Sequence, residues 1–200
     1  MRLNRGFLSL CLLAVFALTA QESRPSCDRC SASYIPAAEL KAYLDRGPAR
    51  AVATGVADQQ VRAVDIGKSN VDVGVVYRGK LAASDSAKSP VAEHDLVSEV
   101  YHVMDGEATL VTGPDIVGVE RRPSTNNNVR NLNGPGSNGT SIRNPVTYHL
   151  KPGDAIVIPA GVGHWFTQID DHIRYLIIRV DPDKVTPLKD EAASKADLAQ

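Results

Sequence analysis

The chain has few aromatic residues and no excess of charge of either sign. Of its 200 residues, 5% are Phe, Trp or Tyr, and the formal net charge is -1. Surfaces that bind nucleic acids need clustered positive charge and aromatic rings on which bases can stack. The composition therefore argues against nucleic acid as a partner, and it provides no charge that would hold the chain to an anionic membrane.

Long hydrophobic runs are also lacking, because the N-terminal apolar run is too short to span a bilayer. It covers residues 7–18, follows Arg2 and Arg5, and precedes the small residues Thr19 and Ala20. This layout is typical of a secretory signal peptide. We therefore expect residues 1–20 to be removed, the mature protein to be periplasmic or secreted, and no membrane association after cleavage.

Cysteine is scarce, which limits the redox and metal chemistry that thiols could support. Outside the predicted signal peptide only Cys27 and Cys30 remain, in a C-x-x-C motif. A thioredoxin-like redox motif would need a preceding strand, and a thiolate metal site would need more ligands nearby. A local disulfide near the mature N-terminus is the favoured interpretation for an exported chain, with a redox pair as the alternative.

The body of the chain shows the alternation of short strands. Between residues 61 and 181, apolar and polar residues alternate on both sides of turn sequences such as Asp105-Gly106, a strong hairpin dipeptide. This pattern predicts an all-β sandwich or barrel. Residues 21–60 are expected to form an N-terminal extension with one short helix over Ile35–Gly47, and residues 182–200 a polar tail that is a surface helix or disordered.

One internal segment has a different composition. Residues 121–144 are dense in Asn, Gly, Ser and Pro and have almost no apolar periodicity. They are predicted to form a long loop, and loops of this length within a compact domain are often functional lids or disordered. A lid over a pocket would exclude water from it.

Two segments carry motif residues at fixed spacings. The residues that match are His94, Glu99 and Gly106 in the first segment, and Gly153, Pro159, Gly161 and His164 in the second. Their order and spacing resemble the two motifs of the cupin superfamily, and the resemblance covers about residues 61–180. It implies a small single-domain cupin, a double-stranded β-helix or jelly-roll barrel. It is also compatible with a homodimer.

The resemblance implies a divalent metal ion (Fe, Mn, Ni or Zn) as the one cofactor, with His94, Glu99 and His164 as ligands. Two imidazoles and one carboxylate are also what a facial metal site with open positions requires. The chain departs from the motifs at Ala92, where cupins place a further histidine ligand, and at Gln168, which replaces an asparagine. The departure at Ala92 implies weaker affinity, one more open position or an empty site.

The remaining histidines have ordinary interpretations. Side chains alternate along a strand, so His102 should point away from the face that carries Glu99. His149 and His172 are interpreted as ordinary strand residues. Glu99 is harder to explain structurally, because a lone carboxylate among Val and Tyr residues is costly to bury.

Three further polar residues are candidates for contact with a substrate. Tyr101 shares a strand face with Glu99 and is the candidate catalytic residue, as an acid, base or hydrogen-bond donor, although a role in the pocket wall is equally compatible with its position. Arg174 and Arg179 could pair with a substrate carboxylate, and strand parity does not decide which of them points inward.

Three functions are compatible with these residues. The favoured one is a metal-dependent enzyme of dioxygenase or lyase type that acts on a small organic molecule. The alternative is a non-catalytic cupin that binds a sugar or an organic acid, which the missing histidine favours. The third is a structural β-barrel in which the Gly and Pro residues serve only as turns.

Overall fold

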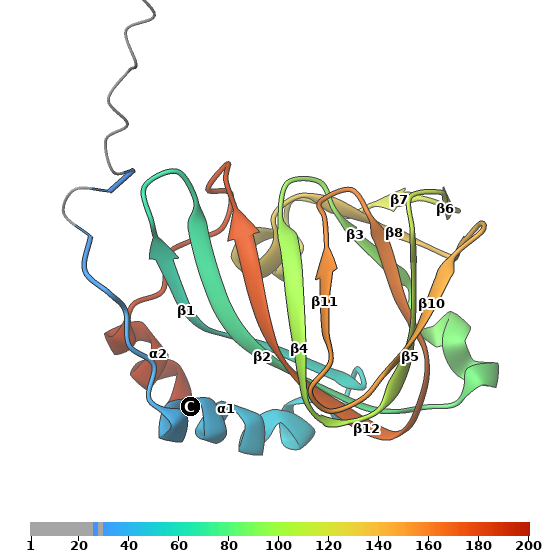
Figure 1. The fold of residues 1–200 in the computed structure, drawn as a ribbon, viewed down its shortest axis with the longest axis horizontal. Coiled ribbons are helices and arrows are strands. Elements are labelled where there is room, and N and C mark those ends of the chain that lie inside the picture. Colours follow the sequence, from blue (N-terminus) through green and yellow to red (C-terminus); the bar gives the residue numbers. More distant parts are fainter. Residues whose placement is uncertain (1–25, 28–29) are drawn as a thin grey trace, which may run out of the picture.

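The protein is a barrel of two antiparallel sheets, with two helices packed at one side (Figure 1). The computed structural model describes residues 26–27 and 30–200. The predicted signal peptide, residues 1–20, lies outside the described residues. Within the described part, no helix is long and apolar enough to cross a membrane. Cys27 and Cys30 are joined by a disulfide, as the favoured interpretation expected.

The first sheet contains five strands. Its order is β1 (Val56–Asp65), β2 (Asn70–Leu81), β12 (Gly163–Asp181), β4 (Ser98–Gly106) and β11 (Ala155–Ile158). The barrel therefore begins at Val56, a few residues before the predicted boundary at residue 61.

The second sheet lies opposite. Its order is β10 (Val146–Leu150), β5 (Ala108–Gly113), β12, β3 (Val91–His94), β8 (Gly136–Gly139) and β7 (Glu120–Arg121). The strands β6 (Ile116–Val117) and β9 (Ser141–Ile142) form a separate ribbon, and a 3-10 helix, η1 (Ala83–Lys88), connects β2 with β3.

Strand β12 belongs to both sheets and closes the barrel. Its first part pairs with β5 and its second part lies between β2 and β4. The register shifts between Phe166 and Gln168 and again between Ile169 and His172, and such bulges bend a strand. The predicted fold class, an all-β jelly-roll barrel, is confirmed by this arrangement.

The main core fills the space between the sheets. Along β4 the inward residues Tyr101 and Val103 are buried, whereas His102 and Met104 are exposed. The buried members of this core are Val76, Tyr101, Val103, Ala108, Leu110, Leu150, Ile158, Phe166, Ile169, Ile173, Tyr175 and Ile177.

The helix α1 (Ala37–Arg50) packs on β1 and β2 through a second apolar cluster of Tyr43, Val61 and Val75. The sequence predicted that this helix ends at Gly47, and this was wrong, because the helix continues to Arg50. Gly47 is buried, and a Cβ there would lie 2.8 Å from Cβ of Tyr77. The glycine therefore allows the helix to approach β2 closely.

The polar C-terminal tail forms a helix on the surface of the barrel, the first of its two predicted states. The helix α2 (Glu191–Leu198) begins after Asp190, whose side chain accepts a hydrogen bond from the Ala193 amide. Ser194 is fully buried, and its hydroxyl lies 3.0 Å from the phenol of Tyr43 on α1. This contact joins α2 to α1.

The prediction that residues 121–144 form a long loop was wrong in part. This segment contains a short π-helix, η2 (Val129–Asn133), and the strands β8 and β9. Strand β8, Gly136–Gly139, pairs with β3 over its whole length. A Cβ on Gly136 would lie 2.2 Å from the Glu93 carbonyl oxygen. The pairing is made by backbone groups and needs small residues, so apolar periodicity does not reveal it.

Candidate metal centre

Three strands bring the predicted ligands to one point inside the barrel. His94 is the last residue of β3, Glu99 the second of β4, and His164 the second of β12. One ligand atom from each lies within 4.8 Å of the others. All three residues are buried, with at most 4% of each side chain exposed. The structure therefore brings together the residues that the sequence selected.

His164 has the protonation that a ligand needs. Its Nδ1 lies 3.2 Å from the Val162 carbonyl oxygen, which can only accept, so Nδ1 carries the proton and Nε2 has a free lone pair. Burial is the main cause that lowers the pKa of His164 to about 4, so the ring is neutral near pH 7. Its Nε2 faces Glu99 Oε2 at 3.5 Å.

Glu99 is held ionised opposite that lone pair. Burial raises the pKa of Glu99, but the hydrogen bond from His94 and the charge of the buried Arg179 outweigh it and keep this pKa well below its usual range. A neutral imidazole nitrogen and a carboxylate oxygen are both hydrogen-bond acceptors. Two acceptors that face each other in a buried place repel unless a proton or a cation lies between them.

Tyr101 donates a hydrogen bond of 2.6 Å to Glu99 Oε2. Burial and the Glu99 charge raise the pKa of Tyr101 well above its usual range, so the phenol stays protonated. The ring also packs against Tyr175, with the two centroids 4.5 Å apart. Tyr101 is thus part of the wall and a donor that fixes the Glu99 carboxylate, and its catalytic role stays a prediction.

His94 is contacted from outside the triad by Arg122. The guanidinium Nη2 lies 3.1 Å from His94 Nδ1 and also donates to the Glu93 carbonyl oxygen. A guanidinium only donates, so in this arrangement Nδ1 accepts and Nε2 carries the proton, 3.4 Å from Glu99 Oε1. Coordination through Nε2 needs the proton on Nδ1, and it would therefore release Arg122 from this contact.

The two arginines that the sequence offered for substrate binding are already paired. Arg179, with 1% of its side chain exposed, donates from Nε to Glu99 Oε1 at 3.2 Å and from Nη2 to Asp58 Oδ2. Arg174 lies at the surface, 3.7 Å from Asp105 and over the Tyr77 ring. Neither guanidinium is left without a carboxylate.

The motif departures have simple structural outcomes. Ala92 pairs with His164 across β3 and β12 and lines the same cavity as the triad, so the position of the absent histidine faces the site. Gln168 is exposed and donates to Asp170, away from the site.

His102 and His149 are exposed strand residues, as predicted. His172, also in a strand, contacts Asp105 and Asp171.

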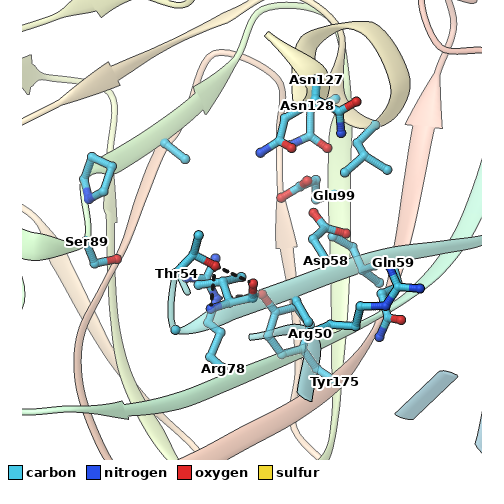
Figure 2. A pocket seen from close by; sticks show the side chains of 18 of the residues that line it. Arg50, Thr54, Asp58, Gln59, Arg78, Ser89, Glu99, Asn127, Asn128 and Tyr175 are labelled. Carbon is cyan, nitrogen blue, oxygen red and sulfur yellow. Dashed lines mark hydrogen bonds between the residues drawn. The ribbon is translucent and has the colours of Figure 1, made fainter. Parts of the chain in front are cut away.

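The triad lines a cavity of about 1080 Å³. In Figure 2, Glu99 and Asp58 lie between Asn127 and Asn128 of the asparagine-rich segment and the pair formed by Arg78 and Tyr175. Asp58, Arg78 and Arg122 were not selected from the sequence. For Asp58 and Arg78 the only sequence signal was strand parity, and for Arg122 there was none. Nothing in the local sequence marks a charged residue as one that points inward.

The strands form a closed barrel, and the two sequence motifs bring their His and Glu residues together inside it. The chain has a cupin-type fold. Comparison of the sequence with protein-family models and with curated proteins gives no match.

Several solved structures are similar to this cupin-type barrel. A structure of the DMSP lyase DddQ from Ruegeria pomeroyi DSS-3 is 20% identical, with 66% of this chain and 49% of that chain covered and a TM-score of 0.38. KdgF from Halomonas sp. is 16% identical, with 66% and 85% covered and a TM-score of 0.38. An oxalate oxidase in complex with glycolate is 19% identical, with 64% and 52% covered and a TM-score of 0.37. This chain thus spans about half the length of the DddQ chain.

Proposed function

We propose that the protein is a metal-dependent enzyme, of dioxygenase or lyase type, that acts on a small organic molecule. The observation that carries this proposal is the pair of facing acceptors, His164 Nε2 and Glu99 Oε2, 3.5 Å apart in a buried place. A divalent cation between them would remove the repulsion, and His94 supplies a third ligand. The donor set of two imidazoles and a carboxylate fits Fe, Mn, Ni or Zn.

Bound there, the ion would act as a Lewis acid at open coordination positions. The chain's own residues prepare the site for this. Arg179 and Tyr101 each hold one oxygen of Glu99, so the carboxylate cannot rotate away. The Val162 carbonyl sets the tautomer of His164. Tyr101 remains the proposed catalytic residue, as a hydrogen-bond donor to the substrate, although its one proton is engaged by Glu99 in the metal-free protein.

The non-catalytic alternative is favoured by one observation. Ala92 lines the cavity where a fourth ligand would stand. A site with three protein ligands binds metal more weakly, and the cavity could hold a sugar or an organic acid without any ion. This alternative predicts that ligand binding survives removal of the metal.

Metal analysis of the purified protein tests the proposal, with Glu99→Gln as the variant and His102→Gln, on the outer face of the same strand, as the matched control. Wild type and His102→Gln are expected to bind a stoichiometric divalent metal. Loss of the carboxylate should weaken metal affinity by about 100-fold or more, beyond the effect of removing a group that only orients a ligand. Equal metal content in wild type and Glu99→Gln would overturn the proposal.

A further inference from the structure

The cavity beside the metal centre carries positive charge, although the chain as a whole does not. Eight Lys and Arg residues line it, against four acidic residues, Asp58, Asp85, Glu99 and Asp197. The formal net charge of the whole chain is -1. A concave site with an excess of one sign of charge attracts ligands of the opposite sign. This distribution favours an anion over a neutral sugar.

Among these cations, Arg78 is fixed in place and has no acidic partner. Its guanidinium lies 4.4 Å from the centre of the Phe166 ring, and its Nε donates to the Tyr175 hydroxyl at 3.1 Å. Within the described residues this is the one hydrogen bond of the Arg78 side chain, which forms no ion pair with Asp or Glu. Arg179, by comparison, is neutralised by Asp58 and Glu99.

The free edge of this guanidinium matches a carboxylate. With Nε engaged by Tyr175, the two Nη atoms remain as a parallel pair of donors. A planar carboxylate can accept both hydrogen bonds at once, and such bidentate pairs are among the strongest in proteins. A partly buried guanidinium without an acidic partner is costly, and binding of a carboxylate would reduce that cost.

The cavity joins this arginine to the metal centre. Figure 2 shows Arg78 beside Tyr175. Tyr175 packs on Tyr101, and Tyr101 donates to Glu99. The rings of Tyr175 and Tyr101, which both line the cavity, lie between the two polar ends. A small molecule with a carboxylate at one end and an oxygen function at the other could therefore contact both.

We propose that the substrate is a small carboxylic acid whose carboxylate is bound by Arg78. This proposal rests on the proposed function, and it names the substrate class for the same site. Arg78 is then a specificity-determining residue. A phosphate is a less suitable ligand, because the Tyr175 and Tyr101 rings between Arg78 and the metal centre offer few donors to its additional oxygen atoms.

Calorimetric binding with defined probes tests this proposal. Lactate, its neutral analogue lactamide and inorganic phosphate are titrated into wild type, Arg78→Gln, Arg78→Lys and the control Arg174→Gln, each with and without Mn²⁺. We expect lactate to bind wild type, and lactamide and phosphate to bind at least about tenfold more weakly, since a hydrogen bond to a charged group is lost or misplaced. Arg78→Gln should lose lactate affinity by a similar factor, Arg78→Lys should lose less, and Arg174→Gln should behave as wild type.

The outcomes separate this proposal from the proposed function. If Mn²⁺ binds but lactate affinity is unchanged in Arg78→Gln, or lactamide or phosphate binds as well as lactate, the assignment of Arg78 is wrong and the metal centre stands. If Mn²⁺ does not bind but lactate still depends on Arg78, the metal-dependent function is wrong and the carboxylate site stands. Absence of lactate binding to folded wild type would overturn the substrate class, and circular dichroism of each variant confirms folding.

Discussion

Replacement of Arg179 by methionine should strongly destabilise the metal-free protein. The Arg179 side chain is 1% exposed and lies between Glu99, 2% exposed, and Asp58, 20% exposed. Water can partly solvate the Asp58 carboxylate after the change, whereas Glu99 is almost fully buried and gains much less from water. Breaking a buried ion pair by removing one partner costs about 3 to 5 kcal/mol, and the partial exposure of Asp58 places Arg179→Met near about 3 kcal/mol.

Urea denaturation of metal-free protein, followed by circular dichroism, measures this free energy of unfolding. Metal must be removed because a bound ion adds stability to the folded state only. The matched control is Arg143→Met, which breaks a two-hydrogen-bond pair with Asp115 whose side chains are 64% and 50% exposed. That change should cost less than about 1 kcal/mol.

A second substitution tests whether the uncompensated Glu99 charge causes this loss of stability. In the Arg179→Met background, Glu99→Gln removes the uncompensated charge and should recover part of the lost stability, although Glu99→Gln alone breaks a favourable pair. A loss below about 1 kcal/mol in Arg179→Met, or a further loss in the double variant, would contradict the view that the buried charges compensate one another.

Two further predictions concern the same interior. Tyr101→Phe removes the 2.6 Å hydrogen bond to Glu99 and should lower metal affinity by about 10- to 100-fold, measured by competition with a chelator; unchanged affinity would exclude a positioning role. Burial raises the pKa of Asp72 from 3.8 to about 6, despite the opposing charge of Arg179. The folded state therefore favours the protonated carboxyl. This stabilising contribution is fully present below the unfolded pKa and is lost as pH rises through about 6. As pH rises from about 4 to about 7, the free energy of unfolding of Asp72→Asn should therefore increase by about 3 kcal/mol relative to that of wild type. Urea denaturation of both proteins across this pH range measures the difference, and parallel pH profiles would refute the prediction.

Much of the centre could be predicted from local sequence. Alternation along β4 places Glu99 and Tyr101 on the inner face and His102 on the outer face, and the structure has all three as predicted. The spacing of the second motif selected His164, which follows the Pro/Gly turn after β11. These features depend on the period of a strand and the geometry of a turn, which neighbouring residues fix.

Other features could not be predicted, because they join residues distant in the chain. β8 was missed because its pairing with β3 is made by backbone atoms of a Gly- and Asn-rich segment. The Asp58–Arg179 pair joins residues 121 positions apart. Arg78 has the sequence environment of an ordinary exposed strand residue, and only the packing of Phe166 and Tyr175 shows that it faces the cavity.

The sequence by itself determined the all-β architecture and the outward orientation of His102, because both follow from alternation. The resemblance of its two motifs to those of cupins selected the three residues that converge on the candidate metal centre. Only the tertiary structure decided which charges compensate one another and which arginine is free to bind a ligand. The physical reason is that burial and ion pairing depend on distances across the barrel, and strand register alone does not set these distances until both sheets are packed.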